Sequence, residues 1–317
     1  MIKVVYFATP EIAVNALKKL MGFSDIHVVG CVTMPDRPAG RGNKICESPV
    51  KKFAAKNGVK LFQTPSVSKD RELIEKLKSL EPDFFVTFAF GQIISQEVID
   101  IPKYGVINLH ASLLPLYRGA NPIQRAIVNG DKETGITTMK TVLKMDAGDI
   151  CMQEKIQITE NMNTTELSEI ISDKAPYLIY RTLKGIVSGA LIPVAQDENL
   201  VTFAPKFTKE DGQLDFNMTS SEFHNKVRGL NPWPCAYIKT GEMCVQILET
   251  ENLKDYRSNA ESGEITETSN EGITVKCSEG AVLIKTVKPQ CKGTMSACSW
   301  INGLRLKTKD RIGVQCL

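Results

Sequence analysis

Hydrophobic runs separated by amphipathic segments dominate the first half of the chain. Residues 3–9, 27–34 and 83–90 are apolar runs of the length of a buried strand. The segment 11–21 carries its apolar side chains three or four positions apart, which indicates a helix between the first two runs. A strand, a helix and a strand in this order are typical of a doubly wound α/β fold. We therefore expect an α/β domain at the start of the chain.

The stretch 106–125 predicts a strand, an apolar loop and a helix. Its strand contains Asn108 and His110, which project from the same face because they lie two positions apart. Its helix begins after Asn121 as N-cap, with Pro122 at the first helical position. Ligands of open α/β sheets bind at the carboxyl ends of strands, so this stretch predicts a functional site.

The pattern changes in the second half of the chain. A long helical pattern ends near residue 188, and residues 189–205 have no clear periodicity. From residue 236 onward, short alternating segments separated by Gly, Asn and Ser predict a small β-barrel or sandwich. A length of 317 residues is typical of two domains. We predict a first domain at 1–188, a linker at 189–205 and a second domain at 206–317.

Charge is distributed unevenly, although the formal net charge is only +3. Residues 36–60 contain seven basic and two acidic side chains, and residues 284–312 contain seven basic and one acidic. Residues 249–271 are acidic, with seven acidic and two basic side chains. The basic segments favour contact with a phosphate backbone, and a solvated surface is the alternative for each.

Several classes of protein are not expected. The sequence begins without a signal-peptide pattern and has no apolar run of membrane-spanning length, so we expect a soluble intracellular protein. Nine scattered cysteines without C-x-x-C pairs favour neither a disulfide framework nor a metal site. The first turn reads Ala-Thr-Pro-Glu at 8–11 in place of G-x-G-x-x-G, so a nicotinamide cofactor is not expected.

Three histidines limit the choices for catalysis. His27 and His224 lie at positions where histidine is usually structural. His110 differs because Asn108 shares its face and Asp146 lies in a glycine-containing loop between strands. Amide and imidazole groups can donate hydrogen bonds to a developing oxyanion while a carboxylate orients the imidazole. The three residue types therefore favour acyl transfer.

The motifs around these residues resemble those of the folate-dependent formyltransferases. The resemblance rests on Asn-x-His-x-Ser-Leu-Leu-Pro at 108–115, Arg-Gly at 118–119 and Met-Asp-Ala-Gly-Asp at 145–149. Within that family, Arg-Pro-Ala-Gly-Arg-Gly at 37–42 and Arg-Gly-Leu-Asn-Pro-Trp-Pro at 228–234 are similar to the members that formylate methionyl initiator tRNA.

The resemblance implies a Rossmann-like first domain and an OB-like β-barrel at the C-terminus. It implies 10-formyltetrahydrofolate as donor, the α-amine of methionyl initiator tRNA as acceptor, no metal, and Asn108, His110 and Asp146 as catalytic residues. We expect a monomer in the cytoplasm of a bacterium, with an organelle as the alternative. The residues implied to bind substrates are Ser112, Leu113, Leu114, Pro115 and Gly91 for folate, and Arg41 and Lys44 for tRNA.

Other functions remain open at this point. A formyltransferase could act on a small amine, such as an amino sugar nucleotide or a purine precursor, and a relative could hydrolyse formyl-folate. A non-catalytic tRNA-binding protein is a further alternative. The order Ser-Pro-Val-Lys at 48–51, Ser-Asp-Lys at 172–174 and Lys-Thr-Gly at 239–241 is that of a serine acyl-enzyme, although Ser48 is better explained as a helix cap. The basic loop around Arg41 favours a nucleic-acid acceptor, because a small amine does not require it.

Overall fold

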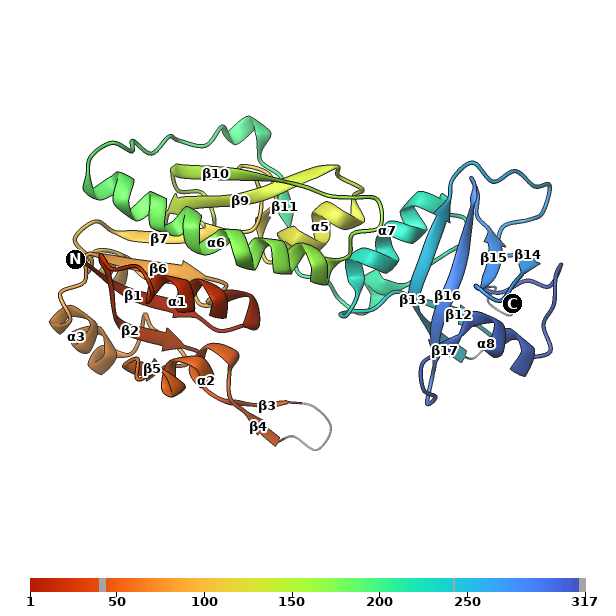
Figure 1. Ribbon diagram of the computed structural model, residues 1–317, viewed down its shortest axis with the longest axis horizontal. Helices are drawn as coiled ribbons and strands as arrows, with labels where there is room; N and C mark the ends of the chain where they lie inside the picture. The colour runs from red at the N-terminus through yellow and green to blue at the C-terminus, as the bar shows by residue number, and fades with distance from the viewer. Residues whose placement is uncertain (40–43, 242, 314–317) are drawn as a thin grey trace. The chain divides into compact units, whose positions relative to one another are not determined.

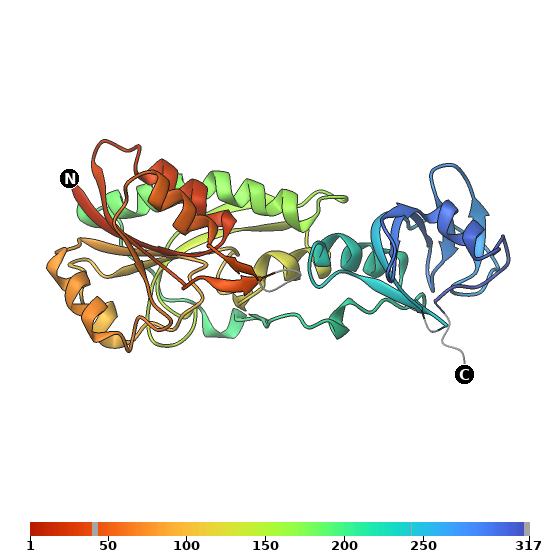
Figure 2. The ribbon, with the colours of Figure 1, turned by 90° about the horizontal axis from the view of Figure 1, so that it is seen from below.

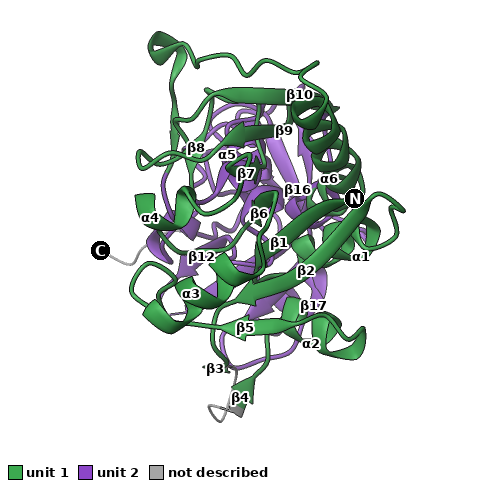
Figure 3. Ribbon diagram, turned by 90° about the vertical axis from the view of Figure 1, so that its left-hand side faces the viewer, with its two compact units in different colours: residues 1–119, 134–156, 168–204 green, residues 120–133, 157–167, 205–317 purple. Residues whose placement is uncertain are grey.

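The computed structural model describes residues 1–39, 44–241 and 243–313, which form two compact units (Figure 3). Unit 1 contains residues 1–119, 134–156 and 168–204, and unit 2 contains residues 120–133, 157–167 and 205–317. The units are thus interleaved in sequence, whereas the predicted domains are continuous. Helix α5 (Pro122–Val128) belongs to unit 2 because it packs against α7 (Ser220–Leu230).

Unit 1 is built on a seven-stranded sheet (Figure 1). In spatial order the strands are β10 (Ile150–Gln157), β9 (Glu133–Lys140), β7 (Val106–His110), β6 (Phe84–Phe88), β1 (Ile2–Ala8), β2 (Ile26–Thr33) and β5 (Leu61–Gln63). In this order, the five strands from β7 to β5 pair in parallel, and β9 runs antiparallel to β7. The predicted Rossmann-like α/β domain is confirmed.

Helices cover both faces of this sheet (Figures 1 and 2). The short 3₁₀ turn η1 (Glu11–Ala13) leads into α1 (Val14–Leu20), which lies on one face with α6 (Thr164–Val187) and α2 (Pro49–Lys56). Helices α3 (Arg71–Ser79) and α4 (Gln96–Ile99) cover the other face, where Leu73, Leu77 and Val98 pack around Phe7 and Phe85. Both faces are buried, which explains why the strands are continuous apolar runs.

Side-chain caps begin both α2 and α3, and the cap of α2 is the predicted Ser48. Ser48 caps α2, with its Oγ accepting a hydrogen bond from Lys51 N at 3.1 Å. The N-cap of α3 is Asp70, whose Oδ1 accepts from Leu73 N at 3.0 Å, and not Ser68. The Ser68 hydroxyl donates to Ile93 O at 2.8 Å and accepts from Ser95 N, so a loop distant in sequence uses it instead.

Two short strands lie within the segment predicted as a basic loop around Arg41. Strand β3 (Arg37–Ala39) pairs antiparallel with β4 (Lys44–Cys46). The backbone of Lys44 lies in β4, and Arg41 lies outside the described residues.

Unit 2 contains an antiparallel sheet, which confirms the predicted all-β character of the C-terminal part. The strand order is β12 (Tyr237–Thr240), β13 (Met243–Leu253), β16 (Ala281–Pro289), β15 (Ile273–Lys276) and β14 (Ile265–Thr268), with β17 (Met295–Ser296) beside β16. Helix α8 (Ala297–Gly303) was not predicted. It is only seven residues long, and its Trp300 and Ile301 complete the core formed by the strands and α7.

The acidic and basic segments of the C-terminal part partly neutralise each other. Lys285 Nζ lies 2.9 Å from Glu251 Oε2 across β16 and β13, and Arg311 Nη1 lies 2.7 Å from Glu261 Oε2. The basic surface predicted from residues 284–312 is therefore weaker than its sequence indicates. In the part of the chain that the structure describes, no helix has the length and apolar character needed to cross a membrane.

His224 on α7 makes the stability of unit 2 depend on pH. The side chain is 3% exposed, its Nδ1 lies 2.9 Å from Thr250 Oγ1, and burial, followed by the charge of Arg228, lowers its pKa. The unfolded chain, with a histidine pKa of about 6.5, therefore binds more protons than the folded chain as the pH falls below that value. We expect the melting temperature to fall between pH 7 and pH 5, and to fall less in His224→Gln. Equal losses in both proteins would contradict this role for His224.

Candidate active site

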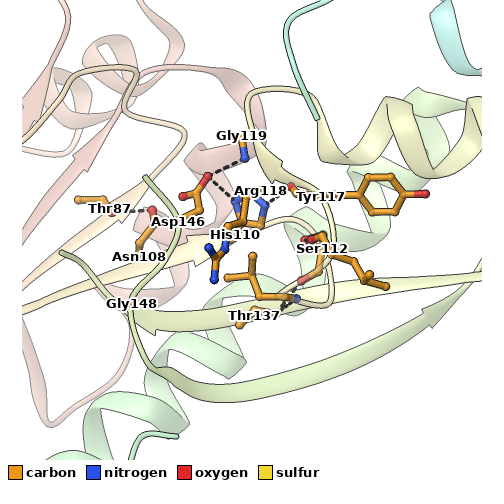
Figure 4. Close-up of polar contacts among 12 residues, drawn as sticks. Thr87, Asn108, His110, Ser112, Tyr117, Arg118, Gly119, Thr137, Asp146 and Gly148 are labelled. Carbon is orange, nitrogen blue, oxygen red and sulfur yellow. Dashed lines mark hydrogen bonds and ion pairs between the residues drawn. The ribbon is translucent and has the colours of Figure 1, made fainter. Parts of the chain in front are cut away.

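Asn108 and His110 lie at the carboxyl end of β7, in the middle of the unit 1 sheet (Figure 4). On the neighbouring strand β6, Thr87 is in register with Asn108, and its Oγ1 donates a hydrogen bond to Asn108 Oδ1 at 2.7 Å. Because the amide oxygen is held in this way, the orientation of the amide is fixed and its Nδ2 is available to donate to a ligand. Thr87 was not predicted as part of the site.

His110 is 6% exposed, and both of its ring nitrogens face defined oxygen atoms. Nε2 lies 2.8 Å from the carbonyl oxygen of Tyr117, and Nδ1 lies 3.7 Å from Asp146 Oδ2. Since a carbonyl oxygen only accepts, Nε2 carries a hydrogen and donates it. The second ring nitrogen, Nδ1, therefore faces the Asp146 carboxylate.

Asp146 lies in the loop between β9 and β10. Its φ is +50°, a left-handed conformation that is uncommon for residues other than glycine. Oδ2 accepts a hydrogen bond from Gly119 N at 2.8 Å, which directs the carboxylate toward His110. Two residues on, a Cβ at Gly148 would come within 1.7 Å of Lys140 O, so only glycine fits this path of the loop. The structure thus brings Asn108, His110 and Asp146 to one edge of the sheet (Figure 4).

The loop 112–115 is held by hydrogen bonds to Leu116 and to Thr137 of β9. Ser112 Oγ donates to Leu116 O at 2.6 Å, and Thr137 Oγ1 accepts from Leu114 N at 3.1 Å while it donates to Ser112 O. Ser112 and Leu114 are buried, and Leu113 packs over Gly135. The backbone is held as well, since Gln153 Nε2 donates to Leu114 O at 2.8 Å and Thr202 N donates to Pro115 O at 3.3 Å, so the loop has a fixed shape.

Gly91 follows β6 and lies near the same edge of the sheet, because Phe88 of β6 is in register with Leu109 of β7. Its φ is +81°, and a Cβ built on it meets no atom within 4 Å. Gly91 is exposed, so the space beside it is open to solvent.

Both parts of the chain match models of one protein family. Residues 2–183 match the formyl transferase family, and residues 206–305 match the formyl transferase C-terminal domain. The chain is 42% identical over 300 residues to the methionyl-tRNA formyltransferase of Clostridium beijerinckii, covering 95% of this chain and 96% of that one. The chain belongs to the methionyl-tRNA formyltransferase family. The corresponding enzyme of Fusobacterium nucleatum is 39% identical to this formyltransferase over 311 residues, covering 98% and 99% of the two chains.

Solved structures share the fold of this formyltransferase at low sequence identity. An N-formyltransferase from Helicobacter canadensis, in complex with folinic acid and dTDP-3-aminofucose, has a TM-score of 0.67 and 19% identity, covering 90% of this chain and 98% of that one. HypX from Aquifex aeolicus, in complex with tetrahydrofolic acid, has a TM-score of 0.63 and 14% identity. The match covers 99% of this formyltransferase and 48% of HypX.

Proposed function

We propose that this formyltransferase transfers the formyl group of 10-formyltetrahydrofolate to the α-amine of methionyl initiator tRNA. The similarity to methionyl-tRNA formyltransferases extends over 95% of the chain and over both family domains, and this observation carries the proposal. The site supports it, because an amide, an imidazole and a carboxylate meet at the edge of the sheet where α/β folds bind ligands. We also propose that it acts as a monomer in the bacterial cytosol, since its relatives are bacterial and one chain supplies all three residues.

The proposed mechanism assigns a different role to each of the three side chains. The folate donor supplies a formyl group whose carbonyl oxygen becomes negative when an amine attacks its carbon. Asn108 Nδ2 donates a hydrogen bond to this oxygen, and its aim is fixed by Thr87. His110 holds a proton on Nδ1, which adds positive charge beside the same oxygen, and Asp146 stabilises that proton. Asp146 also accepts a proton from the attacking amine, through water, and returns it to the departing nitrogen of the donor.

The proposed folate contacts are the loop 112–115 and the open space beside Gly91. The buried side chains of Ser112 and Leu114 act through the shape of the loop, and Leu113 and Pro115 complete its turn. Gly91→Leu places a side chain in this space, although the φ of +81° strains any residue other than glycine. We expect it to raise the KM for the folate donor more than the KM for tRNA, and a melting curve measures the cost of the backbone strain.

Acceptor competition tests the proposed function. Purified protein and 10-formyltetrahydrofolate are offered initiator Met-tRNA, elongator Met-tRNA, free methionine and an amino sugar nucleotide, at a stated salt concentration. We expect formyl-methionine on the initiator tRNA ahead of the other acceptors. Preferential formylation of the amino sugar nucleotide would favour the small-amine alternative, and binding of tRNA without turnover would favour the non-catalytic one.

Arg41 and Lys44 are proposed to contact the tRNA backbone. We expect the double variant Arg41→Ala/Lys44→Ala to raise the KM for Met-tRNA with little change in kcat at saturating tRNA. The slope of log affinity against log salt should decrease by about 1.4 to 1.8, because each lost phosphate contact contributes roughly 0.7 to 0.9.

Lys18→Ala/Lys19→Ala provides the matched control for this pair. Both lysines are exposed on α1, so the change in net charge is the same. An equal loss in the two double variants would show that total charge, and not the loop, sets the affinity.

A further inference from the structure

We propose that Gln196, which lies in the segment 194–204, is a positioning residue for Asp146. The proposal rests on the catalytic role assigned to Asp146 above. Residues 194–204 lie within the stretch that the sequence predicts to be a linker, yet they run beside two loops of the site in unit 1. Strand β11 (Phe203–Ala204) pairs in parallel with β8 (Arg118–Gly119), and Val194 pairs with Ile150.

The side chain of Gln196 holds the backbone of the Asp146 loop. Its Nε2 donates to Asp146 O at 2.9 Å and to Gly148 O at 2.7 Å. One carbonyl belongs to Asp146, whose φ is +50°, and the other belongs to the residue two positions further on. A non-glycine residue keeps such a conformation only where its surroundings hold it in place. Gln196 supplies two of the hydrogen bonds that do so.

The same side chain is held from the opposite side by a buried arginine. Arg118 is 1% exposed, and its Nε and Nη2 both donate to Gln196 Oε1, at 3.0 and 2.8 Å. Nη2 also lies 2.9 Å from Glu198 Oε1, and Glu198 Oε2 lies 2.8 Å from Lys144 Nζ. The hydrogen bonds from Arg118 and Lys144 lower the pKa of Glu198 to about 2, so Glu198 is ionised beside the guanidinium.

Arg118 connects Gln196 to the segment that orients His110. The neighbouring Tyr117 carbonyl accepts from His110 Nε2, and Gly119 N donates to Asp146 Oδ2. Thr202 fixes this segment further, since its carbonyl accepts from Arg118 N at 2.9 Å and its Oγ1 accepts from Tyr117 N at 2.8 Å. Gln196 therefore links the Asp146 loop to the backbone that sets the His110 ring, and so controls how the carboxylate faces Nδ1.

Gln196→Leu removes the hydrogen bonds to Arg118 and to the Asp146 loop. Gln196→Glu removes only the hydrogen bonds to the Asp146 loop. A glutamate keeps an oxygen for Arg118 and lacks the Nε2 that donates to the Asp146 loop. We expect both variants to lower kcat by about tenfold to a hundredfold, the size of effect that a small misplacement of a catalytic group produces. The KM values for donor and tRNA should change much less than kcat. Gln196→Glu places a carboxylate oxygen against the carbonyls of Asp146 and Gly148 but keeps Arg118 paired, so it should melt closer to the wild type than Gln196→Leu does.

Leu200→Ala is the control on the same segment. Its side chain is 57% exposed, so this variant should keep wild-type kcat and melting temperature. A further readout does not require turnover: the peptide covering residues 144–149 should exchange its amide hydrogens faster in Gln196→Glu than in Leu200→Ala.

A double-mutant cycle separates positioning from general destabilisation. In an Asp146→Ala background there is no carboxylate to orient, so adding Gln196→Glu should cost little further kcat. Full additivity of the two changes, wild-type kcat in Gln196→Glu, or unchanged exchange at 144–149 would overturn the positioning role. Absence of formyl transfer by the wild-type protein would instead overturn the proposed function, and exchange at 144–149 would still test the contact of Gln196 with the loop.

Discussion

Asn108→Ala is expected to lower kcat by about a hundredfold to a thousandfold, the usual cost of removing one oxyanion donor from an enclosed site. The reason is local: Asn108 Nδ2 is the polar donor at the carboxyl end of β7, and its direction is fixed because Thr87 holds the amide oxygen at 2.7 Å. The loss should fall on kcat more than on KM, since the oxyanion exists only after the amine attacks. Initial rates at saturating donor and Met-tRNA measure this.

Thr87→Val separates the presence of the amide from its orientation. Valine keeps the shape of the buried threonine and removes the hydroxyl, so Asn108 stays in place without its fixed partner. We expect a smaller loss of roughly tenfold in kcat, in keeping with one neutral hydrogen bond.

Asn108→Ala with more than a tenth of wild-type kcat, and with both substrates still bound, would contradict the role of the amide.

His110→Ala and Asp146→Ala are each expected to lower kcat by about a hundredfold to ten thousandfold, the range of general acid–base and charge-stabilising contributions. The two side chains act as a unit, because Asp146 Oδ2 lies 3.7 Å from His110 Nδ1 and Nε2 is already committed to Tyr117 O. The double variant should therefore be little slower than the slower single variant.

Asp146→Asn tests whether the charge matters more than the shape. Its side-chain oxygen can still accept from Gly119 N, so the loop should keep its geometry. Without the negative charge, the proton on His110 Nδ1 loses its stabilising partner, and kcat should fall as far as in Asp146→Ala. Near-native turnover in Asp146→Asn, or additive losses in the double variant, would separate Asp146 from His110 and require another base. Melting curves show whether each variant remains folded.

The secondary structure of unit 1 was predictable where burial on both sides makes a strand uniformly apolar. Strands β1, β2, β6 and β7 lie within about two residues of their predicted ranges. Elements without that signal were missed. Strand β5 has three residues and α4 has four, so neither presents a clear period. The cap of α3 is ambiguous in the sequence because Ser68 and Asp70 are both good capping residues, and only the loop at 93–95 distinguishes them.

The sequence alone determined the two-part architecture, the strand that carries Asn108 and His110, and the loop that carries Asp146. These follow from local patterns: strand periodicity, glycine in a turn, and a motif shared with the formyltransferase family. Tertiary structure decided which atoms of these residues face one another. Thr87 fixes the Asn108 amide from the neighbouring strand, Tyr117 O determines which nitrogen of His110 faces Asp146, and Gln196 holds the Asp146 loop from 50 positions along the chain. No local pattern encodes such contacts, because each depends on where the folded sheet and the segment crossing its edge bring residues that are far apart in sequence.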